Sequence, residues 1–404
     1  MISNRVAITG VGAVSAAGIG ARALIDLVLE GRSGVRPDAA LGGLPSGAAP
    51  ELPTDRRTRR LDRAARLFVA AADEAWADAG LPAVPEDGAR YAVIEGSSLG
   101  PLGDLLSEHQ SFLESGEKGP PSPLTLVRYT PGAGGSMLAH EHQVHGPVFY
   151  VSAGSVSAML AIGEAYLKVA CGMVDVALTG GAECPLQSDI AAAFVAAGIL
   201  TRDNGRPAAC RPFDRHRAGT VLGEGAGALV LESEAHARAR GARIHALIGG
   251  FGMACETTSA TAPDPEGSGV AAAARLALEQ AGAPDVAWVK AHGTGTKLND
   301  VAECRGLQKL LGSRFAEVPV TSLKAALGHA MGASGAIESV AAALALGRGM
   351  VPPSFGTEDV DPELGSCRIA TRAERSAAGV ALVLGEGFGG RCAALVMERC
   401  PGSV

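Results

Sequence analysis

The sequence predicts an α/β protein whose chain is divided into two similar halves. Apolar, strand-like runs alternate with alanine-rich, helix-like runs, as is typical of helices layered on buried strands. The order of strand, helix, loop with reactive residues and alanine-rich helix occurs once in each half, which is a weak internal duplication. The 404 residues are 47% hydrophobic and 19% charged, which supports a large packed core and excludes a disordered chain.

The first half begins with a predicted buried strand over residues 6–13. A helix is predicted over residues 64–80, because apolar residues recur at helical spacing and a glycine ends the pattern. A loop at residues 151–157 then connects a strand-like run to an alanine-rich helix over residues 159–172. The second half repeats this order with a strand at 246–253, a helix at 269–282, a loop at 318–335 and a helix at 333–346.

The boundary between the halves is expected in the polar stretch 232–243, which gives an N-terminal half of residues 1–235 and a C-terminal half of residues 236–404. Residues 101–128 contain three prolines between positions 120 and 123. We expect this segment to be an inserted excursion that packs on a partner in an oligomer.

The formal net charge of −7 argues against binding to nucleic acid, because phosphate recognition needs a basic surface. One segment departs from this balance by clustering arginines: Arg56, Arg57, Arg59, Arg60, Arg63 and Arg66. The cluster is either a solvated helix face or a docking patch for an acidic partner.

Three features that the sequence lacks predict a cytoplasmic protein. No apolar run reaches the ~18 residues of a membrane span, and no signal-peptide pattern precedes the first strand. The eight cysteines include no pair at metal-ligand spacing, so we expect no metal site and eight reduced, buried thiols.

Gly10 and Gly12 close the first predicted strand in a pattern that invites comparison with a dinucleotide-binding loop. The third glycine of that loop is missing, because Ser15 takes its place. A tight turn from strand to helix is the better interpretation.

A histidine-containing run, His292 to Thr296, follows a predicted strand at 286–291. Its small residues allow a ligand to approach the backbone, and the alternation of Thr294 and Thr296 directs both hydroxyls to one side. The alternative is a histidine whose hydrogen bonds are satisfied within a glycine-rich turn.

Lys324 and His329 lie close together in a segment of otherwise apolar or small residues. A lysine there costs desolvation energy unless it is paired, and Asp300 or Glu303 is the expected partner. The lysine belongs either to a site or to a structural ion pair. Further on, four glycines surround Phe388, which predicts a tight or mobile loop with an aromatic plug, or a turn with a core aromatic.

In this order, the motifs resemble those of the elongating β-ketoacyl-acyl-carrier-protein synthases of the thiolase-like superfamily. The resemblance runs nearly end to end, and its further motifs lie at residues 8–15, 31–35, 179–183, 211–214 and 223–227. It implies a five-layered αβαβα fold of two stacked repeats, and a homodimer or a heterodimer with a second ketosynthase-like subunit. It also implies an acyl carrier protein as partner. The carrier brings the phosphopantetheine, so no cofactor of the chain's own is expected.

The resemblance implies a nucleophile at residue 155, at the buried start of a helix, that takes an acyl group from the carrier protein. His292 and His329 would assist the loss of carbon dioxide from a malonyl carrier thioester and hold its carbonyl. Lys324 would orient His329 and tune its charge.

Further roles follow from the same resemblance. The backbone amides of residue 155 and Phe388 would form an oxyanion hole, and Phe388 would gate the acyl tunnel. Thr294 and Thr296 would contact the phosphopantetheine arm. The arginine cluster matches the region that receives the acidic carrier protein in relatives.

The sequence departs from the family pattern at its centre. Ser155 stands in place of the nucleophilic cysteine, and serine is a much poorer nucleophile without an adjacent base. Glu386 stands where phenylalanine is common, and Arg391 with Cys392 replaces a Thr-Asn pair.

Three interpretations follow from the serine. In the first, Ser155 is acylated with His292 or His329 as base. In the second, the chain is a non-condensing partner, like the chain-length factors of polyketide assembly, and in the third a cysteine was replaced by serine to trap a complex. Because both histidines and Lys324 are retained, we favour an acyl-transferring ketosynthase of polyketide or fatty-acid biosynthesis. The partner subunit comes second and an unrelated oxidoreductase third.

Overall fold

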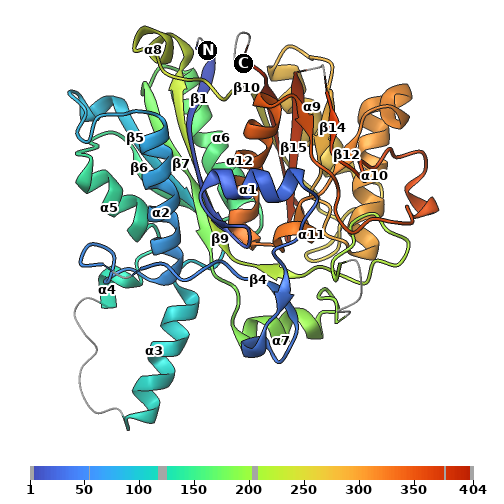
Figure 1. The fold of residues 1–404 in the computed structure, drawn as a ribbon, viewed down its shortest axis with the longest axis horizontal. Coiled ribbons are helices and arrows are strands. Elements are labelled where there is room, and N and C mark those ends of the chain that lie inside the picture. The colour runs from blue at the N-terminus through green and yellow to red at the C-terminus, as the bar shows by residue number, and fades with distance from the viewer. Residues whose placement is uncertain (1–3, 54, 117–124, 203–207, 377–378, 401–404) are drawn as a thin grey trace.

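The computed structural model describes residues 4–53, 55–116, 125–202, 208–376 and 379–400, and its main sheet carries two halves of identical topology (Figure 1). One half has the strand order β6-β5-β7-β9-β1 and the other the order β12-β11-β15-β16-β10. In each half the first two pairings are parallel and the last two antiparallel. The halves join where β1 and β10 pair antiparallel. The predicted duplicated α/β fold is confirmed.

The strands of the first half are β1 (Val6–Ser15), β5 (Tyr91–Gly96), β6 (Val148–Val151), β7 (Val176–Glu183) and β9 (Gly225–Ser233). Those of the second half are β10 (Ala246–Cys255), β11 (Trp288–Lys290), β12 (Val320–Thr321), β15 (Val380–Gly387) and β16 (Arg391–Glu398).

Helices form three layers around the two halves of the sheet (Figure 1). The middle layer contains α6 (Ser157–Ala170) and α12 (Ser334–Gly347), and α1 (Ala21–Leu29) packs on α12. The outer layers contain α2 (Arg63–Asp78) and α5 (Ala133–Glu141) on one side, and α9 (Ser268–Gln280) and α10 (Lys297–Leu311) on the other. The four predicted helices, at 64–80, 159–172, 269–282 and 333–346, are therefore present within two residues at each end.

The composition of the middle helices follows from their position between the two halves of the sheet. Twelve of the fourteen residues of α12 are buried, and most of them are alanine, glycine or serine. Small side chains let the helix approach β9 on one side and β15 on the other. This packing explains why the sequence pattern of α12 is apolar on all sides.

Gly10 and Gly12 lie inside β1, so the predicted turn at this point is wrong. A Cβ on Gly10 would lie 2.0 Å from the carbonyl oxygen of Ala75, and one on Gly12 would lie 1.9 Å from that of Ala71. The glycines therefore allow α2 to pack directly on the strand.

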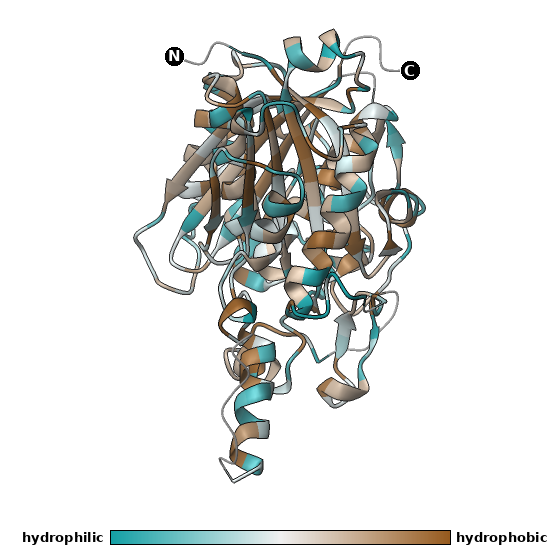
Figure 2. Cartoon of the chain, turned by 90° about the vertical axis from the view of Figure 1, so that its left-hand side faces the viewer, coloured by the Kyte–Doolittle hydropathy of each residue, from teal (hydrophilic) through white to brown (hydrophobic). Residues whose placement is uncertain are grey.

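The predicted insertion forms an arm that stands away from the body (Figures 1 and 2). It contains α3 (Leu102–Glu114) and α4 (Thr125–Arg128), while residues 117–124, with the three prolines, lie outside the described residues. Large apolar side chains are exposed along it, including Leu113 and Leu126, which is 78% exposed.

The predicted division at residues 235 and 236 falls inside α8 (Glu234–Ala239), which connects β9 to β10. Two-domain division at this point remains a proposal. None of the helices in the described part of the chain is long and apolar enough to cross a membrane. All eight cysteines belong to that part and are free thiols, but Cys171 and Cys255 are exposed, so the prediction that all are buried is wrong.

Candidate active site

Ser155 lies in the sharp turn between β6 and α6. Gly154 has a φ of 64°, which favours glycine, and the Ser157 hydroxyl donates to the Gly154 carbonyl at 2.6 Å and accepts the Ala153 amide at 2.8 Å. The Ser155 side chain is thereby held two residues before the first residue of α6 and is only 9% exposed. The positive end of the helix favours negative charge developing at this point.

The two predicted histidines lie side by side, and His329 contacts Ser155. The Ser155 Oγ lies 3.2 Å from His329 Nε2, and the His292 and His329 ring centroids are 5.3 Å apart in an edge-on arrangement. Burial lowers the pKa of both imidazoles well below the ordinary value, and the nearby charge of Lys324 lowers it further. Both rings are therefore neutral at neutral pH.

His329 is oriented by a serine that the sequence did not point to. Its Nδ1 lies 2.9 Å from the hydroxyl of Ser334, the first residue of α12. With the Ser155 hydroxyl donating to Nε2, the proton on Nδ1 donates to Ser334. The ring nitrogens of His329 therefore contact Ser155 and Ser334, while the charge of Lys324 lowers the pKa of the ring. That Lys324 also orients the ring stays a prediction.

Lys324 is paired with Glu338 of α12 at 2.5 Å, so the predicted pairing with Asp300 or Glu303 is wrong. The other carboxylate oxygen of Glu338 accepts a hydrogen bond from Lys290, which also donates to the Leu384 carbonyl at 2.7 Å. All three charged side chains are buried. Burial pushes the pKa of Glu338 up, but the two ammonium groups outweigh it and lower the pKa. The cluster therefore joins two lysines to one carboxylate, and the charges of both lysines act on the two histidines.

Asp300 and Glu303 hold the histidine loop instead. The carboxylate of Glu303 accepts the backbone N–H of His292 at 2.6 Å and of Gly293 at 2.8 Å. That of Asp300 accepts the N–H of Gly295 at 3.1 Å and of Phe213 at 2.8 Å. Burial raises the pKa of Glu303 to about 7.

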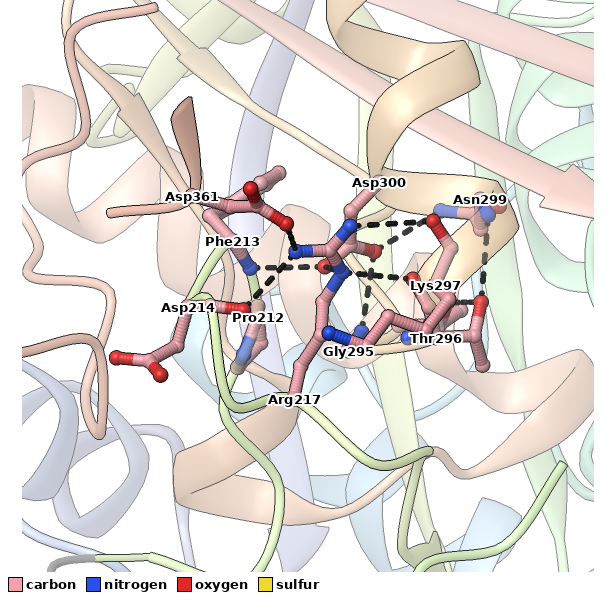
Figure 3. A network of polar contacts seen from close by, with 12 residues as sticks. Pro212, Phe213, Asp214, Arg217, Gly295, Thr296, Lys297, Asn299, Asp300 and Asp361 are labelled. Carbon is pink, nitrogen blue, oxygen red and sulfur yellow. Dashed lines mark hydrogen bonds and ion pairs between the residues drawn. The ribbon is translucent and has the colours of Figure 1, made fainter. Parts of the chain in front are cut away.

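A buried arginine completes this support (Figure 3). Arg217 donates to the carbonyls of Thr296 and Lys297, each at 3.1 Å, and forms ion pairs with Asp300 and Asp361. These contacts tie the loop that carries Thr294 and Thr296 to the start of α10. The loop is therefore supported by buried polar contacts on the side away from the cavity's histidines.

A cavity of about 960 Å³ runs between these elements and has Ser155, His292 and His329 in its wall. Thr294 and Thr296 also line it, with their hydroxyls 3.0 Å apart, as the alternation in the sequence predicts. Lys324 lies behind the wall and does not line it. In the described part of the chain, no group of three or more His, Cys, Asp or Glu residues is arranged to hold a metal ion.

Phe388 lies in the turn between β15 and β16, where it lines the cavity and is 43% exposed. It is not a core aromatic. Its ring lies 6.2 Å from that of Phe194 in α7 (Ser188–Ala196). A Cβ on the neighbouring Gly387 would lie 3.1 Å from the Ser155 amide nitrogen, so the turn abuts the nucleophile position.

The arginine cluster divides into paired and free members. Arg57 forms ion pairs with Asp73 and Glu141, and half-buried Arg63 forms them with Glu224 and Glu51. Within the described residues no ion pair engages the remaining exposed members, Arg56, Arg59 and Arg60. The basic surface is therefore smaller than the sequence suggests.

Two family models match most of the chain. The family model described as "Beta-ketoacyl synthase, N-terminal domain" matches residues 3–237, and "Beta-ketoacyl synthase, C-terminal domain" matches residues 245–358. A protein of Streptomyces cyaneus named "Putative polyketide beta-ketoacyl synthase 1" is 36% identical over 98% of each chain.

Two solved structures are also similar. The ishigamide ketosynthase/chain length factor has a TM-score of 0.90 and is 31% identical, covering 98% of this chain and all of the other. A type II polyketide acyl-carrier protein in complex with its ketosynthase bound to the hexaketide has a TM-score of 0.88 and is 27% identical, with the same coverage.

Proposed function

The chain belongs to the beta-ketoacyl synthase family, and on this premise we propose that it takes an acyl group from an acyl carrier protein onto Ser155 and supports decarboxylative condensation with a malonyl carrier protein. The observation that carries the proposal is that Ser155, His292 and His329 lie in the wall of one cavity.

Acyl transfer begins with the contact between Ser155 and His329. The hydroxyl oxygen attacks the thioester carbonyl as Nε2 takes its proton, and the tetrahedral oxygen is held by the amides of residues 155 and 388. The carrier thiolate then leaves with the proton from Nε2. The product is an ester on Ser155 and a free carrier thiol.

Condensation follows on the same wall. An N–H of His292 holds the carbonyl oxygen of the malonyl thioester while the C–C bond to the carboxylate breaks and carbon dioxide leaves. The resulting enolate carbon attacks the ester carbonyl, and the Ser155 alkoxide leaves and takes a proton from water. Because both imidazoles are neutral, neither forms an ion pair with the malonyl carboxylate. Such an ion pair would stabilise the carboxylate and oppose the release of carbon dioxide.

Ser155 makes this reaction slow, because His329 is a weak base and an oxygen ester is a poorer acyl donor than a thioester. Ser155→Cys is therefore expected to raise the condensation rate with malonyl carrier protein by more than about tenfold. The assay follows the β-ketoacyl carrier product by mass spectrometry. A Ser155→Cys chain that acylates but never condenses contradicts the proposal.

Partner surfaces follow from the same proposal. The exposed Arg56, Arg59 and Arg60 form the docking patch for the acidic carrier protein. The apolar arm of α3 and α4, together with β6 at one end of the sheet, forms the dimer contact, because exposed edge strands and apolar patches of this kind are normally covered.

A second candidate function is that of a non-condensing partner subunit. The observation that favours it is the weak base beside Ser155, which lacks the carboxylate that serine enzymes use. In that case product forms only when a cysteine-bearing ketosynthase subunit is added, and Ser155→Ala leaves the rate of the mixture unchanged.

A further inference from the structure

Arg391 lies in the wall of the cavity, and the proposed reaction does not use its charge. It is the first residue of β16 and lies directly opposite Gly387 of β15. Side chains at opposed positions of an antiparallel pair lie on the same face of the sheet. A Cβ on Gly387 would lie 3.1 Å from the Ser155 amide nitrogen, so Arg391 belongs to the face of the sheet on which Ser155 lies.

The guanidinium group of Arg391 lies beside the turn that carries Ser155. A Cβ on Gly154 would lie 4.0 Å from Nη1, and Nη1 donates to the Phe388 carbonyl at 2.9 Å. The Arg391 side chain is exposed and lines the cavity, so a ligand in the cavity can reach it. Because Gly154 and Gly387 have no side chains, the backbone around the guanidinium leaves room for such a ligand.

The charge of Arg391 is available for a ligand, because no ion pair engages it among the residues that the structure describes. The other cations that line the cavity are held by the protein: Arg217 forms two ion pairs, and Lys297 Nζ donates to a backbone carbonyl at 2.6 Å. The wall also contains two acids. The Glu256 carboxylate accepts two backbone N–H groups, and Glu386 lies on the opposite face of β15, since successive residues of a strand alternate between faces.

We propose that Arg391 recognises a carboxylate on the acyl group held at Ser155, so that the site prefers the half-acyl groups of short dicarboxylic acids, such as succinyl, over uncharged acyl groups of the same length. This inference rests on the proposed function and names its substrate class. A guanidinium group presents parallel N–H donors that match the two oxygens of a carboxylate, and these charge-assisted hydrogen bonds are stronger than neutral ones.

The position of Arg391 indicates which part of the substrate meets it. The phosphate of a phosphopantetheine arm is many bonds from the thioester, whereas the guanidinium lies next to the Ser155 turn, where the acyl group is bound. With its charge matched by the acyl carboxylate, Arg391 does not hold the malonyl carboxylate, whose loss drives condensation.

An equilibrium measurement tests this preference without turnover. Isothermal titration calorimetry compares succinyl and butyryl pantetheine, which have equal numbers of acyl carbons and carry a stable amide in place of the thioester. The wild type is expected to bind the succinyl probe about tenfold more tightly at low salt, because only this probe forms charge-assisted hydrogen bonds. The ratio is expected to fall at high salt, since an exposed charge is screened.

Variants assign the preference to Arg391. Arg391→Gln removes the charge and is expected to lose the preference, whereas Arg391→Lys keeps the charge without the fork and retains part of it. Lys297→Met is the matched control, because it removes the other exposed cation of the cavity wall and should keep the wild-type ratio. Thermal melting checks that the variants are folded.

Each outcome bears on a different statement. Equal binding of the two probes by the wild type overturns the inference and leaves the proposed function standing, a result that needs no variant. Failure of the wild type to bind either probe overturns both. A preference that survives Arg391→Gln, or that is lost in Lys297→Met instead, overturns the role of Arg391. If light scattering then shows that Arg391→Gln has changed the oligomeric state, the guanidinium serves a subunit contact.

Discussion

Ser155 and His329 are joined by a 3.2 Å contact between Oγ and Nε2, and the second ring nitrogen of His329 faces the hydroxyl of Ser334. A carboxylate at that nitrogen would stabilise an imidazolium ion, but a serine hydroxyl does so only weakly. The nearby Lys324 opposes the positive charge further. His329 is therefore a neutral imidazole and a weak base, which fits slow activation of Ser155.

Removing the second contact of His329 tests the role of Ser334. Ser334→Ala is expected to lower the rate of acyl transfer about tenfold or more, because the ring loses the hydrogen bond that fixes its tautomer. Single-turnover acylation kinetics measure the effect. Ser339→Ala is the matched control, since this buried hydroxyl of the same helix has no hydrogen-bond partner among the described residues. Equal rates in the two variants would contradict the role of Ser334.

Removing one of the two buried cations tests their effect on the histidines. Lys290→Met leaves the Lys324–Glu338 pair in place and takes away a positive charge that lowers the pKa of both imidazoles. Their pKa values are expected to rise by about half a unit to one unit. Histidine NMR titration reads the shift directly. The control is Lys309→Met at an exposed lysine of α10, and a shift as large in that variant would point to a nonspecific cause.

The free arginines are expected to determine carrier binding. Reversing Arg56, Arg59 and Arg60 to glutamate should weaken binding of an acyl carrier protein at least about tenfold at low salt, mainly through slower association. Surface plasmon resonance at two ionic strengths measures this. Arg275→Glu on α9, a single charge reversal outside the cluster, should not weaken it and serves as a control beside each single reversal of the three. An unchanged dissociation constant in the triple variant would contradict the docking role of these arginines.

The buried histidines link stability to pH. The unfolded chain takes up protons on His292 and His329 near pH 6.5, while the folded chain does so only at lower pH. Their contribution is complete above pH 6.5 and is lost as the pH falls below it, by up to about 2.7 kcal/mol per pH unit.

Urea unfolding between pH 5 and 8 measures that dependence. Since the raised pKa values of Glu303 and Glu386 give the opposite slope, with stability lost as pH rises, the informative quantity is the difference from a His292→Asn, His329→Asn variant. A variant with the same acid-side slope as the wild type contradicts the neutral state of the rings.

Local patterns in the sequence were sufficient to predict helices, but not to predict which side chains pair with residues far along the chain. The helices over 64–80 and 333–346 follow from periodicity and glycine stops, which depend on neighbouring residues. The partner of Lys324 lies in an alanine-rich helix, where the only signal was a single acidic residue, Glu338, in an apolar run. Ser334 gave no signal, because a serine at a helix start is ordinary.

Glycine and arginine patterns were ambiguous for a related reason. A glycine pair fits a tight turn as well as a strand that a helix approaches closely, and Gly10 and Gly12 belong to the second case. A run of arginines does not reveal which members meet acidic groups far along the chain. Arg57 and Arg63 do so, at Glu141 and Glu224.

The most direct test of the central claim is intact-mass spectrometry of the chain after incubation with an acyl carrier protein. The account predicts a mass increase equal to one acyl group, mapped by peptide digestion to Ser155 and absent from Ser155→Ala. An unmodified wild-type chain, with product formed only after a cysteine-bearing ketosynthase subunit is added, would contradict it.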